Sequence, residues 1–561
     1  MFKIYYKESV NNKYIVNNKM KLHQFIQRRS NAFILLLVYF FLSSILAYIH
    51  ATQDNVFNIL QFVLALSTTF CLFLLVHILI KSRHHFGVFI GTLVLFLLLS
   101  EVSYLVYFGE VISEGVLNSI TETNSYEAFS MLKPVLFITV PALIMTIGIL
   151  FIFKKYITVK FRPILPFTYY LALASLFVSL STTEKNDTHK DYTPELIVLR
   201  QLYPSVLGNL VYLGFISFST DIYADTSEID AFNDAVILPP KNVSDNLVVL
   251  IMGESSLVSR YSAYGYHKPT TPFMEEIFNQ KNGGCIINNS HSSASFTRDS
   301  IPMTLSFNIP ESNDNLFNNK SIIEMAKYNN YKTYWLASYR QSIKGPSNAK
   351  FGFIARKSDE LDFTDKDTEG RHDVNLSKLL EKHLKKDSVT KKFIVIHLRG
   401  SHQPYSDGYD EIDKQALPDA ENYDLTIHHT DRTVKAIYDV INKYSSNYSI
   451  IYTSDHGEIV NLGHGLSKGI DQFLIPFMFI STNNQFDCQF IESFRGSNGY
   501  LSGLMNKYIL SNLLGYQIDQ SILDKEKNND RILLPDNRNV LFLDFLKLNN
   551  QSFVKNVIDN K

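Results

Sequence analysis

Long runs of apolar residues dominate the first third of the chain. Each run is long enough for a helix that crosses a bilayer, which takes about 20 residues. Because the runs follow one another closely, burial in a soluble core explains them poorly, and we expect five transmembrane helices. These helices are predicted near 31–50, 57–80, 86–108, 134–153 and 163–182. The first run is too long and too far from the start to resemble a cleaved signal peptide.

Loops rich in lysine and arginine alternate with loops that are not basic in this region. The leader 1–30, the segment 81–85 and the segment around 154–162 are basic, whereas the loop 51–56 has no Lys or Arg and the loop 109–133 is acidic. Since basic loops stay on the cytoplasmic side, the N-terminus is expected inside and the C-terminal part outside. The predicted domains are a cytoplasmic leader, a transmembrane domain with a periplasmic loop at 109–133, a membrane-proximal linker and a catalytic domain, at 1–30, 31–182, 183–243 and 244–561.

Two features of these segments leave alternatives open. The loop 109–133 suits either an amphipathic helix at the membrane surface or a solvated loop. The apolar piece at 206–215 within the linker would also permit a sixth crossing, which would place the following domain inside.

The remainder of the chain alternates between strand-like and helix-like patterns. Such alternation predicts an α/β domain with a central, mostly parallel sheet covered on both faces. The expected strands are 246–252, 332–336, 393–398, 449–453 and 477–480, and the expected helices are 272–280, 320–329, 376–386 and 423–444. In folds of this kind, ligands bind beyond the carboxyl ends of the strands.

Composition narrows the function further. The formal net charge of −1 gives no sign of a nucleic-acid partner. Of the three cysteines, Cys71 lies in an apolar run, and Cys285 and Cys488 could pair in an oxidising compartment. No Cys-x-x-Cys pair occurs, which argues against a zinc site built from thiolates.

Acidic residues and histidines follow three of the expected strands. Glu254 comes after the first, His402 after the third, and Asp455 and His456 after the fourth. A single such residue is usually a helix cap or a surface group, but three sites at equivalent strand ends point to a shared centre. Carboxylates and imidazole together suit zinc or manganese.

The sequence resembles the phosphoethanolamine transferases of bacterial inner membranes, which belong to the alkaline phosphatase and sulfatase superfamily. The resemblance covers nearly the whole chain. It rests on Met252-Gly-Glu-Ser255, Tyr264-Gly-Tyr-His-Lys-Pro-Thr-Thr-Pro272, Ser292-Ser-Ala-Ser-Phe-Thr-Arg-Asp-Ser-Ile-Pro302, Gly400-Ser-His402 and Ser454-Asp-His-Gly-Glu458, in this order.

The resemblance implies roles for individual residues. Thr297 matches the nucleophile, although Ser292, Ser293 and Ser295 compete by chemistry alone. The implied zinc ligands, with manganese as the alternative metal, are Glu254, Thr297, Asp455 and His456. The phosphoryl group would be bound by Lys344, His402 and His464, with the two histidines also serving in proton transfer, and the membrane-side substrate contacts would be Thr123 and Glu127.

The implied reaction moves phosphoethanolamine from phosphatidylethanolamine, through a threonine-bound intermediate, to lipopolysaccharide or another envelope glycan. The enzyme is expected to be a monomer in the inner membrane with its catalytic domain in the periplasm. The alternative is a glycerol phosphate transferase of the lipoteichoic acid synthase type. A cysteine pair that brackets the nucleophile in lipid A-modifying relatives is replaced here by Ser293 and Met303, so we expect a glycan-core acceptor rather than lipid A phosphates.

Overall fold

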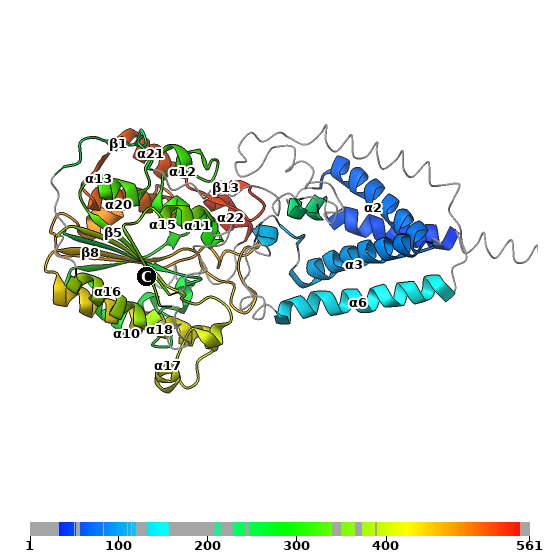
Figure 1. Cartoon of the computed structure of the whole chain (residues 1–561), viewed down its shortest axis with the longest axis horizontal. Coiled ribbons are helices and arrows are strands. Elements are labelled where there is room, and N and C mark those ends of the chain that lie inside the picture. The colour runs from blue at the N-terminus through cyan, green and yellow to red at the C-terminus, as the bar shows by residue number, and fades with distance from the viewer. Residues whose placement is uncertain are drawn as a thin grey trace, which may run out of the picture. The chain divides into compact units, whose positions relative to one another are not determined.

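The chain divides into two compact units in a computed structural model (Figure 1). The structure describes residues 33–49, 51, 57–81, 84–108, 110–113, 115–118, 132–155, 208–210, 212–214, 228–241, 246–338, 349–364, 373–386 and 390–549. The first unit holds most of the N-terminal apolar segments. The second contains the C-terminal domain, and residues 113 and 115–118 of the predicted periplasmic loop also belong to it.

The first unit is helical. Its helices α2 (Ile59–Ile80), α3 (His85–Phe108) and α6 (Leu132–Lys155) match three of the five predicted spans, and each is long and apolar enough to cross a membrane. The N-cap residue of α2 is Asn58, whose side chain accepts hydrogen bonds from two backbone amides of the first turn. The first predicted span contains a shorter apolar helix, Phe33–Ile49. The span predicted at 163–182 and most of the piece at 206–215 lie outside the described residues.

The second unit is built around a seven-stranded sheet with the order β3-β9-β8-β2-β7-β5-β6. Its strands are β2 (Leu247–Gly253), β3 (Gly284–Ile287), β5 (Lys332–Ala337), β6 (Glu360–Phe363), β7 (Lys392–His397), β8 (Tyr448–Ser454) and β9 (Phe477–Ser481). The strands β8, β2, β7, β5 and β6 are mutually parallel, which agrees with the predicted mostly parallel sheet. The prediction missed β3 and β6, and it did not foresee that β9 and β3 pair antiparallel. The sheet is therefore mixed.

Successive residues of β2 point into two separate cores. Val248 and Leu250 pack in one core, and Val249 and Ile251 in the other, as the two-residue period of a strand requires. All seven residues of β2 are buried, which explains why the strand reads as a continuous apolar run.

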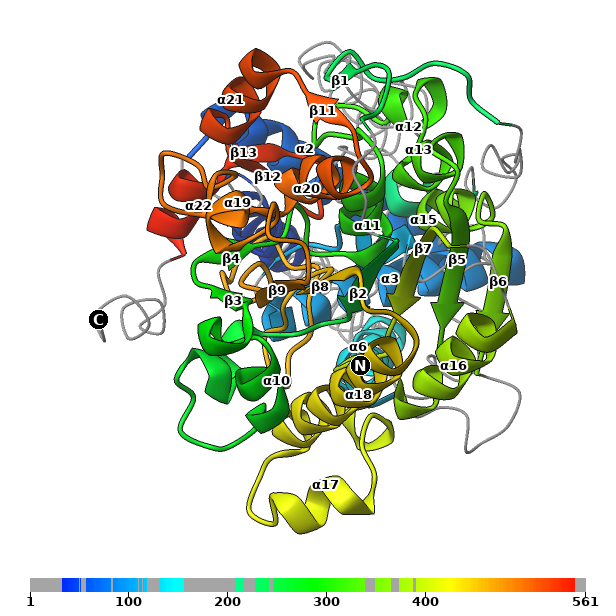
Figure 2. The ribbon, with the colours of Figure 1, turned by 90° about the vertical axis from the view of Figure 1, so that its left-hand side faces the viewer.

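Helices cover both faces of this sheet (Figure 2). α10 (Pro272–Ile277), α16 (Leu376–Lys386) and α18 (Asn422–Tyr444) lie on one side, where the predicted helices were correct within a few residues. α11 (Thr297–Leu305), α13 (Ile322–Tyr328), α15 (Ala349–Ala355) and α20 (Asn506–Leu513) lie on the other. Cys285 on β3 and Cys488 form a disulfide, which confirms the pairing considered from the sequence.

The three central strands bring the predicted site residues to one edge. β2 lies between β7 and β8, with Met252 opposite His397 and Gly253 opposite Ser454. The segments that follow these strands therefore leave the sheet side by side. This arrangement places the residues after Gly253, His397 and Ser454 in one region.

Candidate metal centre and active site

Glu254 stands at the end of the central strand and is almost completely buried. The next residue, Ser255, adopts a left-handed backbone with φ of 53°, which turns the chain sharply away from the sheet. Gly400 approaches the same place from the loop after β7. A Cβ atom at Gly400 would lie 2.6 Å from the Glu254 carbonyl oxygen, and its φ is +54°, so both space and backbone require glycine.

Asp455 and His456 follow β8, the neighbouring strand. One carboxylate oxygen of Asp455 accepts hydrogen bonds from the amides of His456 at 2.7 Å and of Ser255 at 3.2 Å. The Nδ1 atom of His456 is 2.8 Å from the Gly457 carbonyl oxygen, to which it donates its proton. The Nε2 atom is thereby directed at the two carboxylates, 3.2 Å from Glu254 and 3.3 Å from Asp455.

Thr297 is the first residue of α11, and its hydroxyl reaches the same group. It donates a hydrogen bond of 2.9 Å to Glu254 and lies 3.3 Å from His456 Nε2. The competing Ser292 donates instead to the carbonyl of Ala294. Of the described hydroxyls between 292 and 300, Thr297 is the one with a hydrogen bond to this carboxylate–histidine group.

The charges of this group depend strongly on one another. Burial alone would raise the pKa of Glu254, but the adjacent His456 outweighs that effect and holds the pKa well below its usual value. Burial and the charge of Glu254 raise the pKa of Asp455 well above its usual value. Burial would lower the pKa of His456, yet the charges of Asp455 and Glu254 raise it to about 10. Both shifts favour the protonated forms of Asp455 and His456.

These residues fit a divalent metal ion. Glu254, Asp455 and His456 each offer a ligand atom, and these atoms all lie within 4.8 Å of one another. Two carboxylates and one imidazole form a donor set that zinc accepts. A cation would also displace protons from these groups, since metal ligands must be deprotonated.

A second group of this kind is less suited to a metal. Asp410, Asp413 and His429 also lie within ligand distance of a common point. There, however, the guanidinium of Arg432 lies 2.7 Å from Asp410 and 2.9 Å from Asp413. This guanidinium is already paired with both carboxylates, so the group is best explained as a structural ion-pair network.

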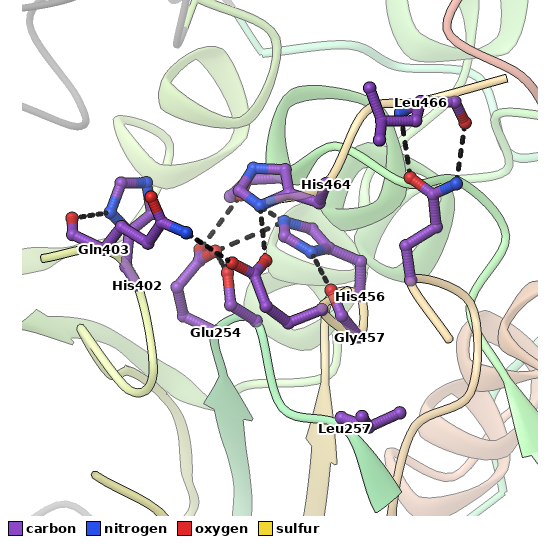
Figure 3. Close-up of polar contacts among 12 residues, drawn as sticks. Glu254, Leu257, His402, Gln403, His456, Gly457, His464 and Leu466 are labelled. Atoms are coloured by element: carbon purple, nitrogen blue, oxygen red, sulfur yellow. Dashed lines mark hydrogen bonds and ion pairs between the residues drawn. The ribbon is translucent and has the colours of Figure 1, made fainter. Parts of the chain in front are cut away.

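His464 lies beside His456, with ring centroids 4.1 Å apart (Figure 3). Its Nδ1 atom donates a hydrogen bond of 2.8 Å to the buried carboxylate of Glu458, which also accepts one of 2.8 Å from the hydroxyl of Tyr405. The bond at Nδ1 leaves Nε2 of a neutral imidazole as a proton acceptor. Burial and the charge of His456 lower the pKa of His464, which favours this neutral form. Glu458 was quoted within a motif, but the sequence did not suggest its contact with His464.

His402 occupies the loop after β7 and lies to the left of His464 and His456 in Figure 3. Its Nδ1 atom is 2.7 Å from the carbonyl oxygen of Gln403, and its ring centroid is 5.9 Å from that of His464. The carboxylate of Asp373 fixes the start of the loop by accepting from the amides of Arg399 and Gly400. The structure therefore brings both predicted histidines near Thr297.

Three predicted site residues, Lys344, Thr123 and Glu127, lie outside the described residues, and their roles stay predictions. A cation that the prediction missed is Lys350 on α15. Its ammonium group lies 3.0 Å from Asp299, two residues after the predicted nucleophile. Nothing in the local sequence around Lys350 distinguishes it from a surface lysine.

The Tyr-Gly-Tyr-His-Lys-Pro motif has a structural explanation. The carboxylate of Asp424 on α18 binds Tyr266 at 3.0 Å, Lys268 at 2.8 Å and Arg260 at 3.0 Å. The hydroxyl of Tyr264 donates to the carbonyl oxygen of Phe477 on β9. The motif thus fastens the segment after β2 to a helix and to a strand.

The sulfatase family model matches residues 246–505, a range that includes Glu254, Thr297, Asp455 and His456. Phosphoethanolamine transferase EptC of Escherichia coli K12 is 24% identical over 393 residues, which cover 64% of this chain and 67% of that protein. Phosphoethanolamine transferase EptA of Helicobacter pylori is 25% identical over 409 residues, covering 65% of this chain and 71% of that protein.

A solved structure has the same fold. It is the integral membrane protein lipooligosaccharide phosphoethanolamine transferase A from Neisseria meningitidis. The two align with a TM-score of 0.55 at 18% sequence identity, over 86% of this chain and 95% of that one. The similarity therefore extends beyond the sulfatase domain into the N-terminal helical region.

Proposed function

Because the chain is similar to phosphoethanolamine transferases and matches the sulfatase family model over residues 246–505, we propose that it transfers phosphoethanolamine from phosphatidylethanolamine to an envelope glycan such as lipopolysaccharide. The single observation that carries the proposal is the contact of the Thr297 hydroxyl with Glu254 and His456 at one sheet edge. A threonine among zinc-type ligands is suited to attack a phosphorus atom, and the hydrophobic helices α2, α3 and α6 suit a donor that resides in a bilayer.

The metal would be held by Glu254, Asp455, His456 and the Thr297 oxygen, and we propose zinc. When bound, it supplies positive charge that lowers the pKa of the threonine hydroxyl and offsets charge on the phosphoryl oxygens. The protein's own part is to hold Thr297 at the N-terminus of α11. The dipole of that helix end favours a negatively charged phosphoryl group nearby.

In the first step, the Thr297 oxygen forms a bond to phosphorus while the bond from phosphorus to the diacylglycerol oxygen breaks. The neutral imidazole of a histidine accepts the Thr297 hydroxyl proton, and the departing alkoxide then takes that proton from the histidine. Phosphoethanolamine is then esterified to Thr297. We assign both transfers of this proton to His464, and the binding of the phosphoryl oxygens to His402.

In the second step, the neutral imidazole of His464 accepts the proton of an acceptor hydroxyl. The acceptor oxygen bonds to phosphorus, the bond from phosphorus to the Thr297 oxygen breaks, and the threonine regains a proton. The same histidine thus serves as acid and then as base, which typically contributes a factor of about 10² to 10⁴. We expect Lys344, Thr123 and Glu127 to bind phosphoryl and lipid groups as the sequence indicates.

The location follows from the same proposal. The catalytic unit would face the periplasm, with the helical region in the inner membrane, where the donor lipid and newly made glycans meet. We keep the expectation of a glycan-core acceptor, because Ser293 and Met303 stand where a cysteine pair brackets the nucleophile in lipid A-modifying relatives. We also keep the expectation of a monomer.

The proposal is tested by reconstituting the purified full-length protein with zinc in vesicles that contain phosphatidylethanolamine labelled in its headgroup. Lipopolysaccharide is added, and lipid A and core fragments are weighed separately by mass spectrometry. We expect a phosphoethanolamine mass increment on the core and an equal release of diacylglycerol. Label transfer from phosphatidylglycerol instead would favour the glycerol phosphate alternative, and an increment on lipid A alone would refute the acceptor while leaving the reaction intact.

A further inference from the structure

Part of the predicted periplasmic loop is built into the catalytic unit. Residues 113 and 115–118 belong to the second unit, although they follow soon after α3 in the sequence. Ser113, Leu117 and Asn118 are buried. The Gly115 amide donates a hydrogen bond of 3.0 Å to the carbonyl oxygen of Pro535. The segment 115–118 is therefore packed within this unit rather than extended into solvent.

The reason for a glycine at position 115 is the ring of Phe296. A Cβ atom at Gly115 would lie 2.2 Å from Cε2 of that ring, far inside van der Waals contact. The φ of Gly115 is not in the left-handed region, so the backbone itself would accept alanine. Close approach to Phe296 is thus the specific constraint at this position.

Phe296 has little room to move away. A Cβ atom at Gly465 would lie 2.1 Å from Cζ of the same ring, so a second glycine backbone approaches it equally closely. The ring also packs edge-on against His464, with centroids 5.9 Å apart and an interplanar angle of 79°. Phe296 is 8% exposed. The ring tip is inserted between the loop segment and the His464 loop.

The position of Phe296 in the chain connects this contact to the reaction. Phe296 is the N-cap residue of α11 and directly precedes Thr297. The C-terminal segment that binds Gly115 through Pro535 also binds the other side of this turn, because the Leu533 amide donates a 2.8 Å hydrogen bond to the Ser293 carbonyl oxygen. The loop segment and the nucleophile turn are therefore each hydrogen-bonded to the same C-terminal segment, 533–535.

We propose that the contact of Gly115 and Gly465 with Phe296 is a positioning device that joins the loop after α3 to the nucleophile, and that it determines reactivity toward phosphodiesters presented in a bilayer. This inference rests on the proposed function, since it assumes that the donor is a membrane lipid. α3 is long and apolar enough to span a membrane, and 109–114 alone separates it from Gly115. A donor presented in a bilayer must reach a nucleophile whose turn is held by this docked segment, whereas the segment itself follows closely after α3 in the sequence. A small water-soluble phosphodiester has no such requirement.

The test compares Gly115→Ala with the control Gly148→Ala in full-length, zinc-loaded protein. Gly148 is a helical glycine of α6 with no atom near an added Cβ. One assay follows transfer from phosphatidylethanolamine in vesicles, and the other follows cleavage of soluble bis(p-nitrophenyl) phosphate. We expect Gly115→Ala to lose about tenfold to a hundredfold in the vesicle assay, where a bilayer-bound donor must be aligned with the nucleophile, and to lose clearly less in the soluble assay, where the donor can adjust its position. Gly148→Ala should keep both.

A size exchange provides the second arm. Leucine lacks the ring atoms that an alanine methyl group at 115 would strike, so Gly115→Ala with Phe296→Leu should recover most of the vesicle activity. Equal vesicle rates for Gly115→Ala and Gly148→Ala, equal losses in both assays, or an additive double variant would each overturn the proposal.

Hydrogen exchange separates this inference from the proposed function. The peptide that contains 113–118 should exchange faster in Gly115→Ala than in the wild type, and it should slow again in the double variant. If the wild type transfers nothing from phosphatidylethanolamine, the proposed donor is wrong, and the assignment to bilayer donors is overturned with it. Unchanged exchange in Gly115→Ala would overturn the docking contact itself, whatever the donor.

Discussion

The hydroxyl of Thr297 donates a hydrogen bond to Glu254, and the imidazole beside it, His456, is a predicted metal ligand rather than an available general base. A threonine in this setting would be activated by a cation bound to the neighbouring ligands rather than by a paired base. This explains why Thr297, and not one of the nearby serines, is the proposed nucleophile.

We therefore expect Thr297→Ala to fold and to lose transfer by about 10³-fold or more, because the covalent step has no replacement group. The measurement is label transfer in vesicles, with the fold checked by circular dichroism. Ser300→Ala, which changes a buried hydroxyl on the same helix, is the control and should stay active. A covalent adduct that maps to Ser295 or Ser300 would show that the nucleophile is misassigned.

Zinc affinity should rise with pH. In the metal-free site, the pKa of His456 is about 10, so near neutral pH it holds a proton that the metal must displace, and the raised pKa of Asp455 acts in the same direction. Affinity should then fall by about tenfold per displaced proton for each unit that the pH drops. Competition with a chelator at several pH values measures the slope, and an affinity independent of pH would contradict this account.

Glu458 should act on the reaction through His464. We expect Glu458→Gln to lower turnover by about tenfold to a hundredfold, as loss of a supporting carboxylate commonly does, because the amide is a poorer acceptor for Nδ1–H. Zinc content should stay unchanged, since Glu458 is not one of the predicted ligands. Tyr405→Phe removes the other bond to the same carboxylate and should have a smaller effect. A loss of zinc in Glu458→Gln would indicate a different role.

At the scale of elements, the site depends on three neighbouring parallel strands whose carboxyl ends share one edge. The loop after β7 can approach Glu254 only because position 400 is glycine. The strands are held by burial on both faces, whereas this loop is held by local contacts, including the bonds of Asp373 to its first amides.

Gly400→Ala should disturb the metal site indirectly, through the contact of position 400 with the backbone of Glu254. Its methyl group would clash with the Glu254 carbonyl. In addition, alanine would have to adopt the left-handed φ of this position, at a cost of about 1–3 kcal/mol. We expect weaker zinc binding and a lower melting temperature, measured by chelator competition and thermal unfolding. Gly265→Ala is the matched control, because Gly265 also has a positive φ but open space around its Cβ position. It should lose some stability and keep zinc affinity, and equal zinc loss in both variants would contradict the contact.

At the scale of the whole molecule, the distribution of basic residues predicts that the catalytic unit faces the periplasm. Alkaline phosphatase fusions after residue 190 should be active, because that reporter folds only outside the cytoplasm, and fusions near Arg83 should be inactive. The opposite pattern would reverse the orientation and remove access to periplasmic acceptors.

The sequence alone determined much of this protein. Continuous apolar runs predicted α2, α3 and α6, because a span needs a length and a composition that few other structures share. Glu254, Asp455 and His456 were predicted as a group, because parallel strands carry their following residues to one edge. The interiors of α16 and α18 were likewise readable from periodicity. These features are local, or they follow from a general rule about parallel sheets.

Only the tertiary structure decided how distant segments meet. β3 and β6 are short, and the antiparallel pairing of β9 depends on which neighbour it finds, so no local pattern specified them. The bond of Glu458 to His464 and the close approach of Gly115 and Gly465 to Phe296 join segments that carry no mutual signal in the chain. Hydrophobic periodicity reports which side of an element is buried, but the partner that covers it is chosen by close packing of the whole domain.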